Sequence, residues 1–493
     1  MFSIKLFGLG GSFLVPLRPF RLSVLAFRLV SGKKHYRITL RVESCGRNLR
    51  FLNYRLQWVK EGKHDSDEGS HMELGWIAYS EQDRRRTMDV LAALHEPTAV
   101  DELGIGIIRD AFANAFFPAT STLLTRAKYF FLVPYALRDL ERRDNRRFSA
   151  DALRKSYDDT EKELAIELLR GARNTQGITG ARSLRSDFSG SWVKRGPGVV
   201  YWSPLRQLGI LKHPSMGYTD YFRAIANSDG RAEERASQDD MDNGWNDDDS
   251  ARTSFWRVPG VTYKQWRNNL SIELTQGEAE FLASRIILSF PDSMLAFILN
   301  DPTLRSGALE LFRSSPKAQD DAVDTEIVGA SLFHDFASAF KESFPEQLSV
   351  LSRHAVVFSD FVYGCRIRYN ALLTGHEEEA EAEWESYSPR ASEFAASLDL
   401  DAIYKLLHLE DHSGAGPLLG FMRTAKEAMR VGDVPKLDDC IIKREHSIKH
   451  DRAKIGRLEG VPETWRSGRR LSYRFGTAMS IVSEIEAAGG CNA

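Results

Sequence analysis

The chain has 493 residues, of which 42% are hydrophobic and 27% are charged, so it is long enough for several domains or one large helical body. No apolar run reaches the ~18 residues that a membrane-spanning helix needs, and we expect no membrane partner. The four cysteines lie far apart and form no CxxC pair, which disfavours a zinc ribbon or a disulfide framework and favours a cytoplasmic location.

Positive charge is concentrated at the start of the chain. Residues 1–71 contain thirteen Lys or Arg and five Asp or Glu, whereas the remaining residues carry a net charge of −10. An acidic body disfavours broad adhesion to nucleic acid, so any such contact needs a local basic patch. We expect residues 1–71 to be a basic extension ahead of a native start at Met72; the alternative is a targeting or membrane-surface arm.

The densest apolar stretch predicts two helices between residues 101 and 143. Apolar side chains spaced by three and four predict the first helix from Gly106 to Phe116. Pro118 cannot continue that helix because it lacks an N–H group. The hydroxyl residues at 120–122 are candidate caps for the second helix, which we expect to kink at Pro134.

The start of this second helix is a candidate anion site. Thr122, Thr125 and Arg126 would share one face there, where free N–H groups and the helix dipole favour negative charge. In the alternative interpretation the hydroxyls only cap the helix. Arg126 then pairs with one of the acids nearby, which are Asp101, Glu102 and Asp110.

A glycine-rich basic stretch follows a helix that we predict from Ala150 to Gly171. Its GxxG turn at residues 177–180 resembles loops that contact phosphate, and a plain turn is the alternative. Four cations near this turn are candidate nucleic-acid contacts: Arg182, Arg185, Lys194 and Arg195. Residues 199–202 read as a short strand or a helix entry, and Ser203 begins a helix through Leu208. This order is compatible with a small winged-helix-like module near residues 170–212.

An acidic segment of low hydrophobicity divides the rest of the chain. Residues 228–252 predict a disordered linker between a helical lobe at 72–227 and a second helical lobe at 253–493. The fold class is therefore mainly α, a multi-lobed helical protein, with strands confined to 199–202 and the N-terminal arm.

The second lobe reads as a series of helices. Thr275 and Glu278 form a capping-box pattern for a helix that ends near Ser289. Gly364 is a candidate break within a later helix, and Gly432 should end another. The further helices are predicted at 293–299, 304–313, 328–342, 346–374, an acidic run at 377–385, 391–408, 416–431 and 477–488.

Charge and aromatic residues alternate in the C-terminal segment 443–475. Between residues 443 and 474 ten Lys or Arg accompany four Asp or Glu, a net charge of +6. Its candidate nucleic-acid contacts are Arg466, Arg469, Arg470 and Arg474, which could hold phosphates beside stacked bases. The alternative is that the segment docks on the acidic body, for example on Glu377–Glu385.

Several sequence stretches resemble an uncharacterised bacterial family, a domain of unknown function. They include LGWIAYSEQDRRRTMDVL, VDELGIGIIRDAF, FPATSTLLTRAKYFFLVPY and LSYRFGTAMSIV, and the resemblance extends over about Met72–Ile485. Members of that family often lie near genes for helicases and phospholipase-D-like nucleases in defence or mobile-element neighbourhoods. The resemblance implies no activity and transfers no catalytic residue.

No P-loop, dinucleotide fingerprint, HExxH or GxSxG motif occurs, so we assign no catalytic residue, metal or cofactor. His446 and His450 have metal-ligand spacing, but neighbouring cations disfavour a bound dication. The leading hypothesis is a noncatalytic accessory protein that contacts nucleic acid and works with a helicase or nuclease. A protein–protein adaptor and an enzyme with an unfamiliar site are the alternatives. One shared basic face would favour nucleic acid, and dispersed arginines would favour the adaptor.

Overall fold

The computed structural model divides by its internal contacts into two compact units, Met1–His95 and Glu96–Ala493. It describes residues 2–5, 12–15, 24–31, 34–41, 103–143, 145, 147–171, 175–184, 188, 190–227, 254–260, 263–314, 325–373, 377–410, 412, 414–455 and 469–490. The first unit contains two antiparallel hairpins, in which β1 (Phe2–Lys5) pairs with β2 (Ser12–Val15) and β3 (Val24–Ser31) pairs with β4 (Lys34–Arg41). The predicted start at Met72 lies outside the described residues.

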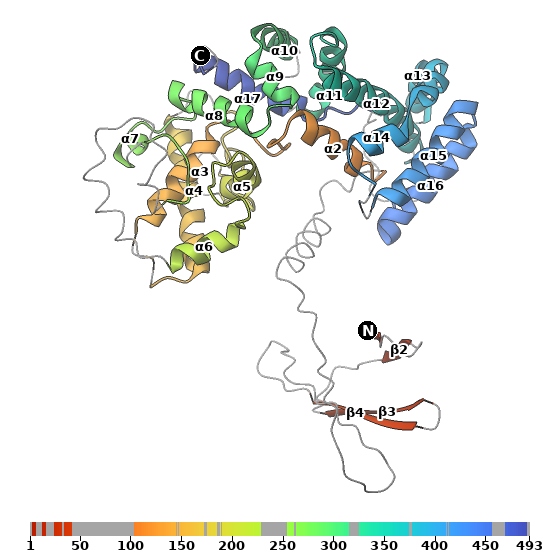
Figure 1. Cartoon of the computed structure of the whole chain (residues 1–493), viewed down its shortest axis with the longest axis horizontal. Helices are drawn as coiled ribbons and strands as arrows, with labels where there is room; N and C mark the ends of the chain where they lie inside the picture. The colour runs from red at the N-terminus through yellow and green to blue at the C-terminus, as the bar shows by residue number, and fades with distance from the viewer. Residues whose placement is uncertain are drawn as a thin grey trace. The chain divides into compact units, whose positions relative to one another are not determined.

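The second unit is built from helices, so the predicted mainly α fold is confirmed (Figure 1). The helices are α2 (Gly106–Phe116), α3 (Tyr129–Glu141), α4 (Ala150–Gly171), α5 (Pro197–Gln207), α6 (Tyr218–Ala226), α7 (Tyr263–Asn268), α8 (Gln276–Ser289), α9 (Met294–Asn300), α10 (Pro302–Ser314), α11 (Thr325–Ala339), α12 (Glu346–Leu372), α13 (Glu377–Ser397), α14 (Leu400–Leu406), α15 (Ala415–Val431), α16 (Val434–Lys449) and α17 (Phe475–Ala487). A short 3-10 turn, η3 (His450–Arg452), follows α16. Within the described part of the chain, no helix has both the length and the apolarity needed to cross a bilayer.

Several helix boundaries agree with local sequence signals. α2 and α4 have their predicted ends. Thr275 and Glu278 form the predicted reciprocal capping box at the start of α8. Gly432 takes the left-handed conformation that ends α15. Gly364 does not break α12, which continues through it while the ring of Tyr387 packs against its backbone.

The predicted start of α3 is wrong, and at residues 199–202 the helix entry, one of the two alternatives, is the correct one. α3 begins at Tyr129 rather than at residues 120–122, and Leu123 is exposed. Residues 199–202 belong to α5 rather than to a strand, because Pro197 occupies the first helical turn after the extended Gly196. In the described residues between 170 and 212 no strand is present to form a wing. The one isolated bridge there pairs Leu211 with Trp256.

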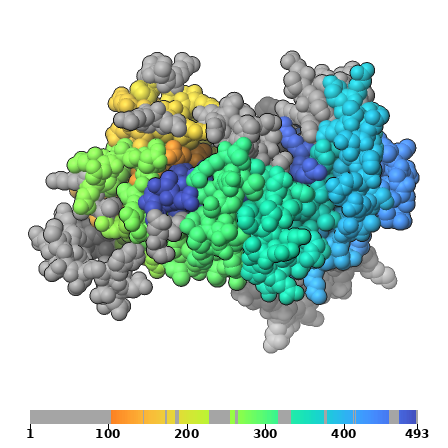
Figure 2. Space-filling model, turned by 90° about the horizontal axis from the view of Figure 1, so that it is seen from above, coloured from red at the N-terminus to blue at the C-terminus, as the bar shows by residue number. Residues whose placement is uncertain are grey.

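Aromatic side chains join elements that are distant in the sequence. The ring of Phe112 in α2 lies 5.9 Å from that of Phe358 in α12 and 5.4 Å from that of Tyr473. Phe333 in α11 lies 6.2 Å from Phe475, the first residue of α17. α17 also packs on α8 and α10, and in the space-filling view its dark-blue surface is bordered by their green surfaces (Figure 2).

Buried ion pairs connect the early helices with the late ones. Lys128 Nζ lies 2.6 Å from Glu278 Oε2, and both side chains are buried. The guanidinium of Arg126 lies 3.2 Å from Glu484 in α17. The predicted linker 228–252 lies outside the described residues, and the division into two lobes on either side of it stays a prediction.

Candidate nucleic-acid interface

The basic loop, residues 175–198, lies between α4 and α5 and is held by tertiary contacts. The backbone N–H of Thr179 donates to the Tyr129 hydroxyl at 2.9 Å. Further along, the Gly190 N–H donates to the Leu184 carbonyl at 3.3 Å, and the ring of Trp192 lies against Gly180. These contacts pack residues 179–184 against residues 190–192 and anchor the described part of the loop.

A buried carboxylate holds the end of this loop. Glu161 of α4 accepts the Gly198 N–H at 2.5 Å, in the first turn of α5, where helix N–H groups have no partner within the helix. A Cβ atom at Gly196 would clash with Glu161 Oε2, so a larger residue there would displace the carboxylate from its present position. The carboxylate and the glycines therefore form one packed unit.

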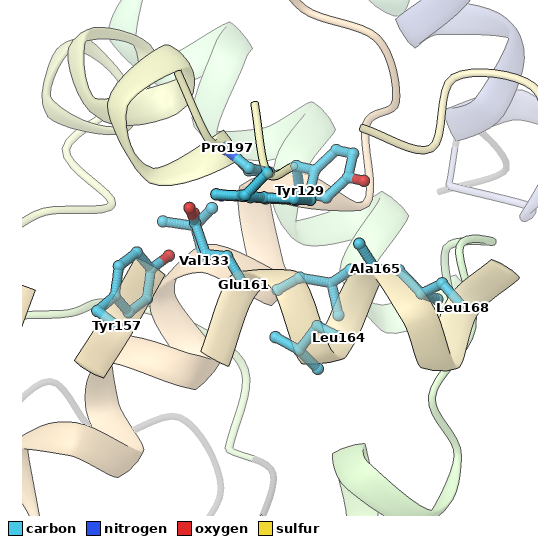
Figure 3. Close-up of a pocket in the computed structure, with 10 residues that line it drawn as sticks. Tyr129, Val133, Tyr157, Glu161, Leu164, Ala165, Leu168 and Pro197 are labelled. Carbon is cyan, nitrogen blue, oxygen red and sulfur yellow. The ribbon is translucent and has the colours of Figure 1, made fainter. Parts of the chain in front are cut away.

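Glu161 is 5% exposed, and burial raises its pKa to about 8, partly offset by the hydrogen bond from Gly198. The interaction of this carboxyl with the Tyr157 hydroxyl also lowers its pKa. Both side chains lie beside a cavity of about 10 Å³ between α3, α4 and Pro197 (Figure 3). That volume is close to the smallest that holds one water molecule. The cavity is therefore a place for water and not for a substrate.

The outer side of the loop is basic. Arg182, Lys194 and Arg195 are all exposed. Arg170, at the end of α4, stacks on Phe188 of the loop with 5.0 Å between its guanidinium carbon and the ring centroid. The fourth predicted cation, Arg185, lies outside the described residues. The described cations of this stretch thus belong to one packed loop.

A family comparison covers this part of the chain. Residues 71–230 match the model of a family of unknown function, DUF6361. The matched residues therefore include α2 to α6 and the basic loop. No match was found among the curated proteins or the solved structures.

The predicted anion site in the DUF6361 segment already holds internal carboxylates. Arg126 lies 3.0 Å from Glu273 and 3.2 Å from Glu484, and its side chain is 13% exposed. The Ala127 N–H also donates to Glu484, at 3.2 Å. Burial raises the pKa of Glu484 to about 7, while Arg126 lowers it. Among the described residues Arg126 pairs with Glu273 and Glu484 rather than with Asp110. Asp101 and Glu102, the other expected partners, lie outside the described residues.

The two threonines of that site lie outside the helix. Thr122 and Thr125 are exposed and precede α3. The N–H groups of Thr125 and Arg126 donate to the Tyr201 hydroxyl at 2.9 and 3.1 Å, and that hydroxyl donates to the Arg126 carbonyl. The Tyr201 hydroxyl therefore bonds backbone groups of a segment that was predicted to be the start of the helix.

Two of the C-terminal arginines, Arg470 and Arg474, form contacts with other residues of the second unit. Arg470 lies 2.6 Å from the buried Asp360 of α12, and its guanidinium stacks on Tyr363. Arg474 donates to the Asn114 side chain at 2.7 Å and to the Thr120 carbonyl at 2.9 Å. These partners lie on α12 and beside α2 rather than on Glu377–Glu385.

The remaining C-terminal candidates are Arg469 and Arg466. The Arg469 carbonyl accepts a hydrogen bond from Arg366 at 3.2 Å, and Arg466 lies outside the described residues. The basic loop packs on α3 and α4, whereas residues 469–474 pack on α12 and α2. The two candidate groups are thus built on different helices.

Sequence reasoning missed Glu161, although a signal was present. In α4 the buried positions include Leu153, Tyr157, Leu164 and Leu168, and Glu161 falls between them on the same helical face. A single acid on an apolar stripe predicts a buried carboxylate with a special partner. No group of three or more metal-binding side chains occurs in the part of the chain that the structure describes.

Proposed function

We propose that this chain is a noncatalytic accessory protein that contacts nucleic acid through the basic loop, residues 175–198. The observation that carries the proposal is the exposure of Arg182, Lys194 and Arg195 on one loop whose described part is anchored by tertiary contacts. Cations on such a loop neutralise phosphates and release counterions, which supplies affinity without base recognition. Because residues 72–493 carry a net charge of −10, binding through this loop should be local and sensitive to salt.

The family resemblance supports a particular kind of partner and cellular system for this accessory protein. Members of the family that the chain resembles often lie near genes for helicases and phospholipase-D-like nucleases, which favours such an enzyme as the partner, within a bacterial defence or mobile-element system. The widely spaced cysteines favour the cytoplasm. In this arrangement the chain would hold or position nucleic acid while its partner performs the chemistry.

The test compares two triple variants of the full chain. Arg182→Ala, Lys194→Ala and Arg195→Ala remove the loop cations, whereas the matched control removes three exposed cations elsewhere: Arg353, Lys405 and Lys436. Binding to labelled single- and double-stranded DNA and RNA is measured by fluorescence anisotropy over a series of salt concentrations.

The loop variant should bind at least about tenfold more weakly, and its log–log salt slope should fall by roughly 2–3 because each phosphate contact contributes about 0.7–0.9. The control should keep the slope of the unmodified protein. Equal affinity in the two variants, or no binding by the unmodified protein at low salt, would refute the proposal.

A protein–protein adaptor is the second candidate, favoured by the internal pairing of Arg126, Arg470 and Arg474. Arginines that stabilise the fold add nothing to a nucleic-acid surface. Affinity purification from the native host, with and without nuclease, separates the two functions. Partners that survive nuclease, together with no binding to any nucleic acid, would favour the adaptor.

A further inference from the structure

A second surface feature lies far from the basic loop in the sequence. α13 packs on α15, and α15 packs on α16, so that these helices lie side by side (Figure 1). Between them is a cavity of about 140 Å³. Its apolar lining includes Trp384, Met429, Val434 and Leu437, and we call it the α13–α16 pocket.

The walls of the pocket are fixed by contacts behind the lining. Arg368 forms a bidentate pair with Asp438 at 2.6 and 2.9 Å, and its guanidinium stacks on Trp384. The Ser392 hydroxyl donates to the Arg430 carbonyl at 2.9 Å, which joins α13 to the end of α15. The pocket is therefore formed before any partner arrives.

The size of the pocket selects a single bulky apolar group. A dry cavity of roughly 150 Å³ holds a benzene ring in other proteins. A volume of 140 Å³ thus suits one leucine, methionine or phenylalanine side chain and is smaller than the roughly 300 Å³ of typical ligand pockets. Interface anchors are side chains of this kind, buried in preformed pockets.

Negative charge near the pocket favours a partner segment whose residues beside the apolar side chain are positively charged. Between residues 377 and 385 the sequence has six glutamates and no cation. Glu381 and Glu385 are exposed. Glu381 lies three residues before Trp384, and Glu385 lies three residues before Ser388; Trp384 and Ser388 line the pocket. Asp433, at the opposite wall, is also exposed.

We infer that the α13–α16 pocket docks a lysine- or arginine-rich segment of a partner protein through one bulky apolar side chain. The anchor fills the pocket beside Trp384, and the flanking cations face the glutamates of α13. Charge complementarity steers such a segment toward the acidic wall, and the pocket then fixes its register. This inference does not depend on the proposed nucleic-acid contact.

The experiment uses the full chain and a fluorescent peptide with one phenylalanine between lysine-rich flanks. Two control peptides carry alanine in place of phenylalanine or glutamates in place of lysines. Ser388→Trp fills the pocket from an exposed position, and Ser386→Trp adds the same ring at an exposed site two residues away, on another side of α13. A double variant, Glu381→Lys with Glu385→Lys, reverses the rim charge.

The peptide with phenylalanine and lysines should bind at least about tenfold more tightly than either control peptide. S388W and the charge-reversed variant should each raise its Kd by about tenfold or more, and S386W should leave it unchanged. If S388W melts at a lower temperature than S386W, Ser388→Leu takes its place.

Three results would overturn the inference. They are the absence of peptide binding, equal binding by S388W and S386W, and no preference for phenylalanine over alanine in the peptide. A change of molar mass in S388W alone would show that a second copy of the chain occupies the pocket and would also overturn it.

Discussion

The protonation of Glu161 should make stability depend on pH in an unusual direction. Burial raises the pKa of this carboxyl from 4.5 to about 8 in the folded chain. Below about pH 4.5 the group is neutral in both the folded and the unfolded chain, so its burial does not lower the free energy of unfolding through ionisation. As the pH rises toward 8 the unfolded chain releases this proton first, so the free energy of unfolding falls; above 8 the loss is complete.

The magnitude follows from the size of the shift. One pKa unit corresponds to about 1.4 kcal/mol, so a shift from 4.5 to about 8 predicts a loss of roughly 3–6 kcal/mol between pH 5 and pH 9. Glu161→Gln carries no charge at any pH, and its amide oxygen can still accept the Gly198 N–H. The variant should therefore lack this part of the pH dependence.

Urea denaturation of both proteins at several pH values between 5 and 9 measures the effect. The stability of E161Q relative to the unmodified chain should increase steadily with pH and level off above about pH 8. Glu484, whose pKa is raised to about 7, titrates in both proteins and cancels in the comparison. Parallel pH profiles for the two proteins would refute the reasoning, because Glu161 would then be ionised in the folded chain.

Three further substitutions test the packing around the candidate interface. Gly196→Ala places a methyl group against the Glu161 carboxylate and should lower the free energy of unfolding by about 1–3 kcal/mol in urea denaturation. Lys128→Met leaves Glu278 buried without its cation and should cost about 3–5 kcal/mol, and adding Glu278→Gln should recover part of that loss. Arg474→Ala should cost about 1–3 kcal/mol through its lost hydrogen bonds, while anisotropy shows unchanged affinity for nucleic acid.

Helices whose ends are set by nearby residues could be predicted from the sequence. The capping box at Thr275 and the left-handed Gly432 are such signals, since each satisfies helix-end groups within a few residues. The mainly α class followed from the same periodic patterns. These features need no knowledge of tertiary contacts.

Where the prediction failed, a distant side chain had satisfied the backbone. Residues 120–128 have helical periodicity, yet the Tyr201 hydroxyl takes the N–H groups of Thr125 and Arg126, so α3 starts later. The β-branched residues at 199–200 favour a strand locally, but Pro197 and the bond from Gly198 to Glu161 start a helix there.

In the candidate site, too, local features could be predicted from the sequence and contacts between distant residues could not. The cations of the basic loop could be predicted from the sequence because a polar, glycine-rich stretch between two helices indicates an exposed loop. The partner of Arg126 is not, since Glu273 lies 147 residues away along the chain. A sequence therefore shows which charges exist, whereas the fold decides which of them reach the surface.

Because some charged residues are buried, the net charge of the sequence is a poor guide to whether its surface binds nucleic acid. Residues 72–493 carry a net charge of −10 in the sequence, which disfavours contact with nucleic acid. In the structure several carboxylates serve as internal acceptors for backbone N–H groups: Gly198 donates to Glu161, Ala127 to Glu484 and Ile455 to Glu445. With its pKa near 8, Glu161 is mostly uncharged at neutral pH. Because Glu161 is mostly neutral, it contributes little to the surface potential, so the field at the basic loop depends on the charged groups around the loop and not on the sum over the chain.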